Sequence, residues 1–307
     1  MNFKISNADE LQLKRQNNRR QNNFHHFDLN RFDFMPAKGI FSCPVLTNDE
    51  VARGIFLMRL LAPEIAARVS PGQFVNVKTS AEKSNACSPL LRRPFSVCEV
   101  DRRAGTIAII WKIVGPGTNL LALHHPGTFL SLIGPLGHGF DLAKLTGPVA
   151  LVAGGVGVAP LPILAMDLAG RRLPFAVLLG ARNADELWGD RELAKLGGNV
   201  QIATDDGSLG EKGLVTHLLA AWLRKHKNSA AQVFACGPMP MLNAVAKLCR
   251  EARVEAQLAI ETMMGCGFGI CMGCPVVPAA GVGKNGRYYL ACLDGPVFSA
   301  KAIRFEE

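Results

Sequence analysis

The sequence predicts an α/β plus all-β protein with three parts: an antiparallel β-barrel, a doubly wound parallel domain and a small C-terminal domain rich in cysteine. Three observations predict this fold. Short β-like runs split by Gly and Pro fill residues 35–146, apolar strands alternate with helical stretches over 147–250, and closely spaced cysteines lie within 251–307. Such spacing of short strands is typical of a small barrel, and such alternation is typical of a parallel sheet.

The individual elements can be taken from short stretches of sequence. The barrel strands are expected in "GIFLMRLLA", "GQFVNVKT", "PFSVCEVD", "GTIAIIWKIV" and "GTFLSLIGPLG". The parallel strands are expected in "VALVAG", "FAVLLGA", "VQIATDD" and "QVFACG", with helices in "LPILAMDLAG" and "LVTHLLAAWLRKH". Residues 251–307 contain too few apolar side chains for a core of their own, so another feature must hold them, and the cysteines are the candidates.

Composition and charge exclude several classes of protein. A chain of 307 residues with 49% hydrophobic and 19% charged residues is typical of a folded protein with two or three domains. The net charge is +9, but residues 14–20 form the one dense basic run, so nucleic-acid binding is not expected. The uncharged stretch 148–166 contains three Gly and three Pro, which favours a strand, a glycine turn and a helix over a membrane span.

The first 34 residues differ from the rest of the chain. Residues 1–34 contain seven Asn and three Gln with no apolar period, so we expect a disordered extension that precedes a folded start at Met35. No secretory signal is apparent in them, and the nine cysteines are grouped late in the chain. Both features favour a reducing, cytoplasmic setting in which grouped cysteines hold metal.

Four cysteines form the strongest motif. Cys266, Cys271, Cys274 and Cys292 give the spacing C-x4-C-x2-C-x17-C. Three close thiolates followed by a distant one is the plant-type ferredoxin arrangement for a 2Fe–2S cluster. The surrounding glycines would permit the tight turns that aim backbone N–H groups at the sulfides. A zinc site or a free redox pair is the alternative, although zinc sites usually present two compact ligand pairs and here only Cys271 and Cys274 form one.

Two stretches of the barrel offer groups that suit a phosphate and a flavin. In "RRPFSV" (92–97), Arg93 can donate two hydrogen bonds to a phosphate, Pro94 stiffens the turn and Ser96 offers a hydroxyl to a flavin ring. In "GPGTNLL" (115–121), Gly117 and Thr118 supply a bare amide and a hydroxyl ahead of a helical run, which favours an anion site.

Two turns of the parallel domain suit a dinucleotide. "GGVGVAPL" (154–161) follows a strand and is expected to open a helix, and Gly154, Gly155 and Gly157 would let a pyrophosphate approach. "ACGPMPML" (235–242) ends the last parallel strand with Cys236, Gly237 and Pro238. Because ligands of such sheets gather at the carboxyl ends of the strands, both turns should face one crevice.

In this order, the motifs resemble the ferredoxin–NADP reductase superfamily over residues 36–307. Three further stretches, "GPLGHGF" (134–140), "TDDGSLGEKGLVT" (204–216) and "ACLDGPVF" (291–298), together with the four cysteines, are similar to the electron-transfer subunits of NAD-dependent (class B) dihydroorotate dehydrogenases. The resemblance implies FAD, a 2Fe–2S cluster and NAD as cofactors. It places the cluster on the four cysteines. It places the flavin contacts on Arg93, Pro94, Phe95, Ser96, Ile110, Trp111, Lys112, Gly117 and Thr118.

The resemblance also implies a partner and a division of labour. It implies a separate FMN-containing catalytic subunit, in a heterotetramer of two plus two, that oxidises dihydroorotate in pyrimidine (UMP) biosynthesis. This chain would pass the electrons on to NAD⁺, because a flavin can exchange both single electrons and hydrides. The alternatives are a subunit of a hydrogenase or of a bifurcating ferredoxin–NADP oxidoreductase, and a zinc-stapled interaction module that has lost its flavin. Asp205 and Asp206 are expected to be turn residues.

Overall fold

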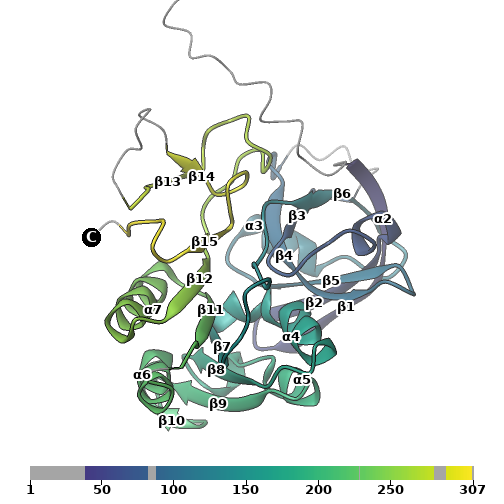
Figure 1. The fold of residues 1–307 in the computed structure, drawn as a ribbon. Helices are drawn as coiled ribbons and strands as arrows, with labels where there is room; N and C mark the ends of the chain where they lie inside the picture. Colours follow the sequence, from purple (N-terminus) through teal and green to yellow (C-terminus); the bar gives the residue numbers. More distant parts are fainter. Residues whose placement is uncertain (1–38, 82–87, 228, 280–287, 306–307) are drawn as a thin grey trace, which may run out of the picture. The chain divides into compact units, whose positions relative to one another are not determined.

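The computed structural model describes residues 39–81, 88–227, 229–279 and 288–305. The predicted disordered extension over residues 1–34 lies outside the described residues. Figure 1 shows a barrel built from the first half of the described chain, followed by a sheet flanked by helices, with the cysteine-rich segment last in sequence. None of the described helices is both long enough and apolar enough to cross a membrane.

Six antiparallel strands close into the predicted barrel, in the order β1-β2-β5-β4-β3-β6. The strands are β1 (Gly39–Ala52), β2 (Ile55–Leu61), β3 (Phe74–Val77), β4 (Arg93–Asp101), β5 (Thr106–Lys112) and β6 (Phe129–Leu136), and two short helices, α2 (Pro63–Ala66) and α3 (Pro116–Ala122), lie between them. Val75 and Val77 of β3 lie in the hydrophobic core of the barrel, and all four residues of this strand are buried. The barrel prediction is therefore confirmed, and β1 adds a strand that precedes the quoted runs.

The second half contains a seven-stranded sheet in the order β10-β9-β8-β7-β11-β12-β15, in which only the β12–β15 pairing is antiparallel. Its strands are β7 (Val149–Gly154), β8 (Phe175–Ala181), β9 (Asn199–Thr204), β10 (Glu211–Lys212), β11 (Gln232–Cys236), β12 (Glu255–Ala259) and β15 (Val297–Ser299). The helices are α4 (Leu161–Gly170), α5 (Asp190–Lys195), α6 (Val215–Lys225) and α7 (Met239–Ala252). Figure 1 shows α4 and α5 on one face and α6 and α7 on the other, which confirms the doubly wound fold.

The C-terminal segment is held partly by this sheet. Strand β12 pairs in parallel with β11, and β15 pairs with β12, so both ends of the segment are anchored by backbone hydrogen bonds. Between them lie the cysteines and a small antiparallel pair, β13 (Pro275–Val276) and β14 (Tyr289–Leu290). The cysteines therefore lie in a loop whose two ends are fixed by the sheet, so this segment does not depend on a metal alone for its structure.

Candidate cluster, flavin and nucleotide sites

The four predicted cluster cysteines come together as two pairs. Cys266 and Cys271 lie in the cluster loop (residues 265–274), where the N–H of Cys271 donates to Cys266 Sγ at 3.4 Å. Cys274 and Cys292 form the second pair, with their sulfurs 3.2 Å apart. Cys274 and Cys292, which are 18 positions apart in the sequence, thus form one close pair of thiols.

Backbone N–H groups of the cluster loop point at the sulfurs. The N–H of Phe268 donates to Cys266 Sγ at 3.5 Å, and the N–H of Cys292 donates to Cys274 Sγ at 3.5 Å. This orientation depends on positive φ angles at Gly267 and Gly269, +83° and +91°. Residues with a side chain rarely adopt such angles, so glycine is needed there. The bare backbone predicted for a cluster-binding loop is therefore present.

These contacts favour the thiolate, which is the form that binds metal. Burial opposes ionisation of Cys266, but N–H donors from Cys271 and Phe268 lower its pKa to about 7. The hydrogen bond between the sulfurs of Cys274 and Cys292 lowers the pKa of Cys274 to about 6. That same hydrogen bond, together with burial, raises the pKa of Cys292. Part of the thiol group is thus ready to bind a cation near neutral pH.

The two thiol pairs match the ligands of a 2Fe–2S cluster in number and type. Within the described ranges, no three His, Cys, Asp or Glu side chains are placed as a group that could hold a metal ion. A structural zinc needs four donors around one centre. A 2Fe–2S cluster is held by four thiolates, two for each iron, and two thiol pairs with N–H donors aimed at sulfur supply that donor set.

The predicted flavin residues line a place where two barrel strands separate. The pairing of β4 with β5 runs from Asp101↔Thr106 to Val97↔Ile109. Beyond it, residues 93–96 pair with β3 and residues 110–112 pair with β2, so the strands diverge. We name residues 93–96, 110–112 and 117–118 the flavin edge.

Arg93 lies against the start of α3, which the sequence does not predict. A Cβ at Gly117 would be 3.4 Å from Arg93 Nε, so a larger residue would crowd the guanidinium. Arg93 also donates to the carbonyls of Leu91 and Arg92, which orient it. A cation and the first turn of a helix are thus brought to one spot, and their role toward a phosphate stays a prediction.

Three side chains of the flavin edge are engaged elsewhere in the structure. The Thr118 hydroxyl accepts hydrogen bonds from the N–H groups of Val114 and Gly115 at 2.9 and 3.1 Å, so it shapes the loop rather than facing outward. The Trp111 indole is 2% exposed and donates to the Thr118 carbonyl. The Ile110 side chain is equally buried in the core between the two halves. Contacts from Ile110 and Trp111 to a ligand would therefore come from their backbone.

The two turns predicted to share a crevice do lie together. We name residues 154–157 the nucleotide turn. A Cβ at Gly157 would be 2.3 Å from the Cys236 carbonyl, and one at Gly154 would be 3.1 Å from Pro238 Cδ. The chain needs glycine at 157, because the backbone of the 236–238 turn packs directly on it, and at Gly154 a Cβ would also meet the Met241 side chain. Gly155, with φ +56°, is exposed and has open space around it.

The stretch 154–161 leads into the helix as expected, by way of a 3₁₀ turn, η2 (Gly155–Val158), after which α4 begins at Leu161. Gly155 is the exposed part of this backbone, and the approach of a pyrophosphate to it stays a prediction. Cys236 is 3% exposed, and burial raises its pKa, so its thiol is neutral.

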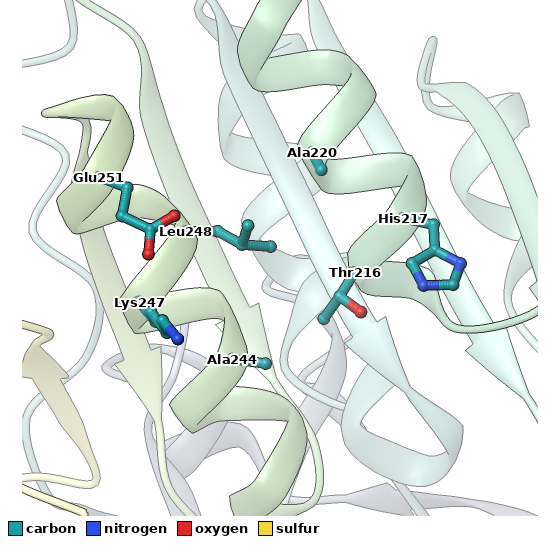
Figure 2. Close-up of a pocket in the computed structure, with 7 residues that line it drawn as sticks. All are labelled: Thr216, His217, Ala220, Ala244, Lys247, Leu248 and Glu251. Atoms are coloured by element: carbon teal, nitrogen blue, oxygen red, sulfur yellow. The ribbon is translucent and has the colours of Figure 1, made fainter.

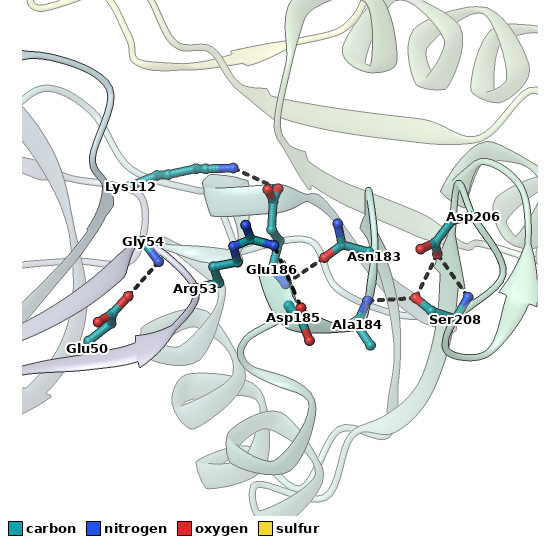
Figure 3. Close-up of polar contacts among 10 residues, drawn as sticks. All are labelled: Glu50, Arg53, Gly54, Lys112, Asn183, Ala184, Asp185, Glu186, Asp206 and Ser208. Carbon is teal, nitrogen blue, oxygen red and sulfur yellow. Dashed lines mark hydrogen bonds and ion pairs between the residues drawn. The ribbon is translucent and has the colours of Figure 1, made fainter.

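Polar contacts join the flavin edge to the loops at the carboxyl ends of β8 and β9 (Figure 3). Lys112 Nζ is 2.7 Å from Glu186 Oε2, in η3 (Ala184–Glu186), which we name the bridging turn. The N–H of Ala184 donates to Ser208 Oγ, and Ser208 donates to Asp206 Oδ1. The side chain predicted to touch a flavin thus contacts the other half of the chain, and Asp206 is the turn residue that the sequence predicts.

A separate groove of about 350 Å³ lies between α6 and α7 (Figure 2). It is lined by Thr216, His217, Ala220, Ala244, Lys247, Leu248 and Glu251. None of these residues is a predicted site residue. The groove lies on the face of the sheet that α6 and α7 cover, so it does not belong to the three sites above.

Sequence reasoning missed the residues that connect the sites. Asn76 on β3 donates to the carbonyl of Cys266, and Arg92 donates to the Asn76 carbonyl and to Ser131. The sequence motifs do not point to Glu186 as the partner of Lys112 either. A signal did exist for Asn76, because an Asn inside the apolar run "QFVNV" is unfavourable in a strand unless its amide has a partner.

Comparison with protein families gives two matches. The iron-sulfur cluster binding domain of dihydroorotate dehydrogenase B matches residues 261–304, which include all four cluster cysteines. An oxidoreductase NAD-binding domain matches residues 151–247, which include the nucleotide turn and the 236–238 turn.

Whole-chain relatives give the same assignment. The dihydroorotate dehydrogenase B (NAD(+)) electron transfer subunit of Desulforamulus reducens is 38% identical over 268 residues, which cover 87% of this chain and 99% of the relative. The subunit of the same name from Geobacillus thermodenitrificans is 39% identical, with 84% and 96% covered. A structure of an NADH-dependent reduced ferredoxin-NADP oxidoreductase, described for flavin-based electron bifurcation, superposes with a TM-score of 0.74 at 28% identity, covering 87% of this chain and 91% of the other.

Proposed function

Because the chain belongs to the family of dihydroorotate dehydrogenase B (NAD(+)) electron transfer subunits, we propose that it passes electrons from the FMN of a catalytic subunit, by way of a 2Fe–2S cluster and FAD, to NAD⁺. Its pathway would be pyrimidine (UMP) biosynthesis. The observation that carries this proposal is the presence of two pairs of thiols, Cys266 with Cys271 and Cys274 with Cys292.

The residues that would hold each group follow from the contacts. The four cysteines would hold the iron, and the N–H groups of Phe268, Cys271 and Cys292 would stabilise negative charge on the sulfurs. Arg93 and the backbone around Gly117 would bind the flavin diphosphate, with the flavin edge open between β4 and β5.

A flavin suits the intermediate position because it exchanges both single electrons and hydrides, whereas an iron–sulfur cluster passes single electrons and a nicotinamide takes a hydride. The protein would place NAD⁺ at the carboxyl ends of β7 and β11, beside Gly155 and the 236–238 turn. The dihydroorotate chemistry would belong to the partner subunit. We propose a cytoplasmic heterotetramer of two copies of each subunit.

A second candidate function is supported by the structural comparison. The bifurcating oxidoreductase covers as much of this chain as the Desulforamulus reducens relative does, 87% in both cases, although its identity is lower, at 28% against 38%. In that case the partner would be another flavoprotein rather than a dihydroorotate oxidase. The identity of the partner therefore separates the two candidates.

Anaerobic purification from native cells, with identification of the proteins that accompany the full-length chain, tests the proposal. We expect an FMN-containing subunit, and we expect the complex to reduce NAD⁺ when given dihydroorotate. Recovery of a different flavoprotein, with no reduction of NAD⁺ by dihydroorotate, would contradict it.

A further inference from the structure

Asn76 makes the direct polar contact between the barrel and the cluster loop. Its side chain is fully buried, and its Nδ2 donates to the carbonyl oxygen of Cys266 at 2.7 Å. The two residues are 190 positions apart in the sequence. If this hydrogen bond were lost, the Asn76 amide would be a buried donor without an acceptor, which would lower the stability of the protein.

The cluster loop is shaped to admit this amide. A Cβ at Gly267 would lie 2.6 Å from Asn76 Nδ2, and φ at Gly267 is +83°. Both the close approach and the backbone conformation require glycine at this position. Asn76 from the barrel and Gly267 from the cluster loop therefore form a close contact that needs both residue types.

The barrel side of this contact lies inside the sheet and next to the flavin edge. Asn76 pairs with Pro94 of β4 on one side and with Ile133 of β6 on the other. The Arg92 guanidinium binds the carbonyl of Asn76 and both the carbonyl and hydroxyl of Ser131, which ties β3 to β6. Asn76 thus links the strand beside the predicted flavin site to the first cysteine of the cluster loop.

We propose that Asn76 is a positioning residue that holds Cys266, and with it the cluster loop, at a fixed place against the flavin edge. This inference rests on the proposed function, since it concerns the position of a cluster relative to a flavin. The hydrogen bond also fixes the direction of the Cys266 carbonyl dipole next to the iron ligands. Residues that orient metal ligands in this way tune both the retention and the electronic properties of a metal centre.

The test compares two isosteric substitutions. Asn76→Asp keeps the size of the side chain and replaces the donor by an acceptor. Asn48→Asp is the matched control, because Asn48 is also a barrel Asn whose Nδ2 donates to backbone carbonyls, those of Leu121, Ala122 and His124. The readouts are the rate of iron release to a chelator, the EPR spectrum of the reduced full-length protein and the unfolding temperature.

We expect Asn76→Asp to release iron about tenfold faster than the unmodified protein, which is the lower end of the effect of removing an outer-shell partner of a metal ligand. We also expect its EPR g-values to shift. Asn48→Asp should lower the unfolding temperature while leaving the g-values and the release rate unchanged. Gly267→Ala, which displaces the Asn76 amide from the opposite side, should shift the g-values as well.

Each outcome bears on the inference. Unchanged g-values and release rate in a folded Asn76→Asp protein would overturn it, and so would an equal change in Asn48→Asp, since that would indicate general loosening of the barrel. If Asn76→Asp fails to fold, Asn76→Ser, which shortens the side chain and removes the amide donor without adding a charge, decides by the same readouts. An unmodified protein that binds no iron would refute the proposed function instead, so the two failures are distinguishable.

Discussion

Glycine is concentrated in the cluster loop and in the nucleotide turn, and the structure gives it a different cause in each. In the cluster loop, Gly267 and Gly269 adopt positive φ angles that aim N–H groups at sulfur. In the nucleotide turn, glycine is needed at 157 because a Cβ there would lie 2.3 Å from the Cys236 carbonyl. Glycine thus serves the backbone conformation in the cluster loop and the close packing of two turns in the nucleotide turn.

The largest expected effect comes from the cluster loop. Cys274→Ala removes one of four thiolates from a buried pair, and we expect nearly complete loss of bound iron, since a cluster of this kind needs all four ligands. The control is Cys249→Ala, a buried cysteine of α7 outside the thiol group. Iron and sulfide assays on both variants make the comparison. Equal iron in both proteins would show that Cys274 is not a ligand.

The nucleotide turn should respond through stability instead. Gly157→Ala places a Cβ 2.3 Å from the Cys236 carbonyl, and overpacking of this kind costs about 3 kcal/mol. Gly155→Ala meets open space and should cost about 1 kcal/mol, from its positive φ alone. Urea unfolding of the two variants measures the difference. A smaller loss for Gly157→Ala than for Gly155→Ala would contradict the packing explanation, and neither change should alter the iron content.

The sequence predicts the elements better than it predicts what the side chains contact. The runs from "GIFLMRLLA" to "QVFACG" correspond to observed strands because their periodicity reflects burial, which is a local property. The pairing of β12 with β11 was not predicted, because "EAQLA" contains nothing that specifies its neighbour. The same limit applies to Lys112, whose partner Glu186 lies in another part of the fold.

The flavin edge offers an intermediate effect. Arg93→Ala removes a guanidinium beside Gly117, and we expect FAD affinity to fall about thirtyfold, because hydrogen bonds to charged groups contribute about 2 kcal/mol. Arg102→Ala is the control, since Arg102 follows the opposite end of β4 and donates to the Val69 carbonyl. Flavin fluorescence titration measures both. Equal affinities in the two variants would remove Arg93 from the site.

The smallest effects are expected at the bridging turn. Glu186→Gln weakens the contact with Lys112. The side chains of Lys112 and Glu186 are 28% and 21% exposed, so the substitution should lower the free energy of unfolding by about 1 kcal/mol. Asp185→Asn weakens the exposed pair with Arg53, with side chains 72% and 76% exposed, and should change stability by less than about 0.5 kcal/mol. Thermal unfolding at low and high salt measures both. A larger loss for Asp185→Asn would reverse the expected ranking.

The cluster site was predictable from sequence to a degree that the other sites were not. Four closely spaced cysteines point to an iron–sulfur domain, and the family match over residues 261–304 agrees, whereas the Thr118 hydroxyl and the Trp111 ring are used inside the fold by contacts that the motif does not reveal. Asn76 illustrates the same limit, because its acceptor on Cys266 is brought to it only by the tertiary fold.

The most direct test is an iron, zinc and acid-labile sulfide assay of anaerobically purified full-length protein, combined with EPR after dithionite reduction. Two thiol pairs that bind a 2Fe–2S cluster predict iron and sulfide in equal amounts and a half-integer-spin signal in the reduced protein. A folded protein that contains zinc, lacks sulfide and gives no signal after reduction would contradict the account.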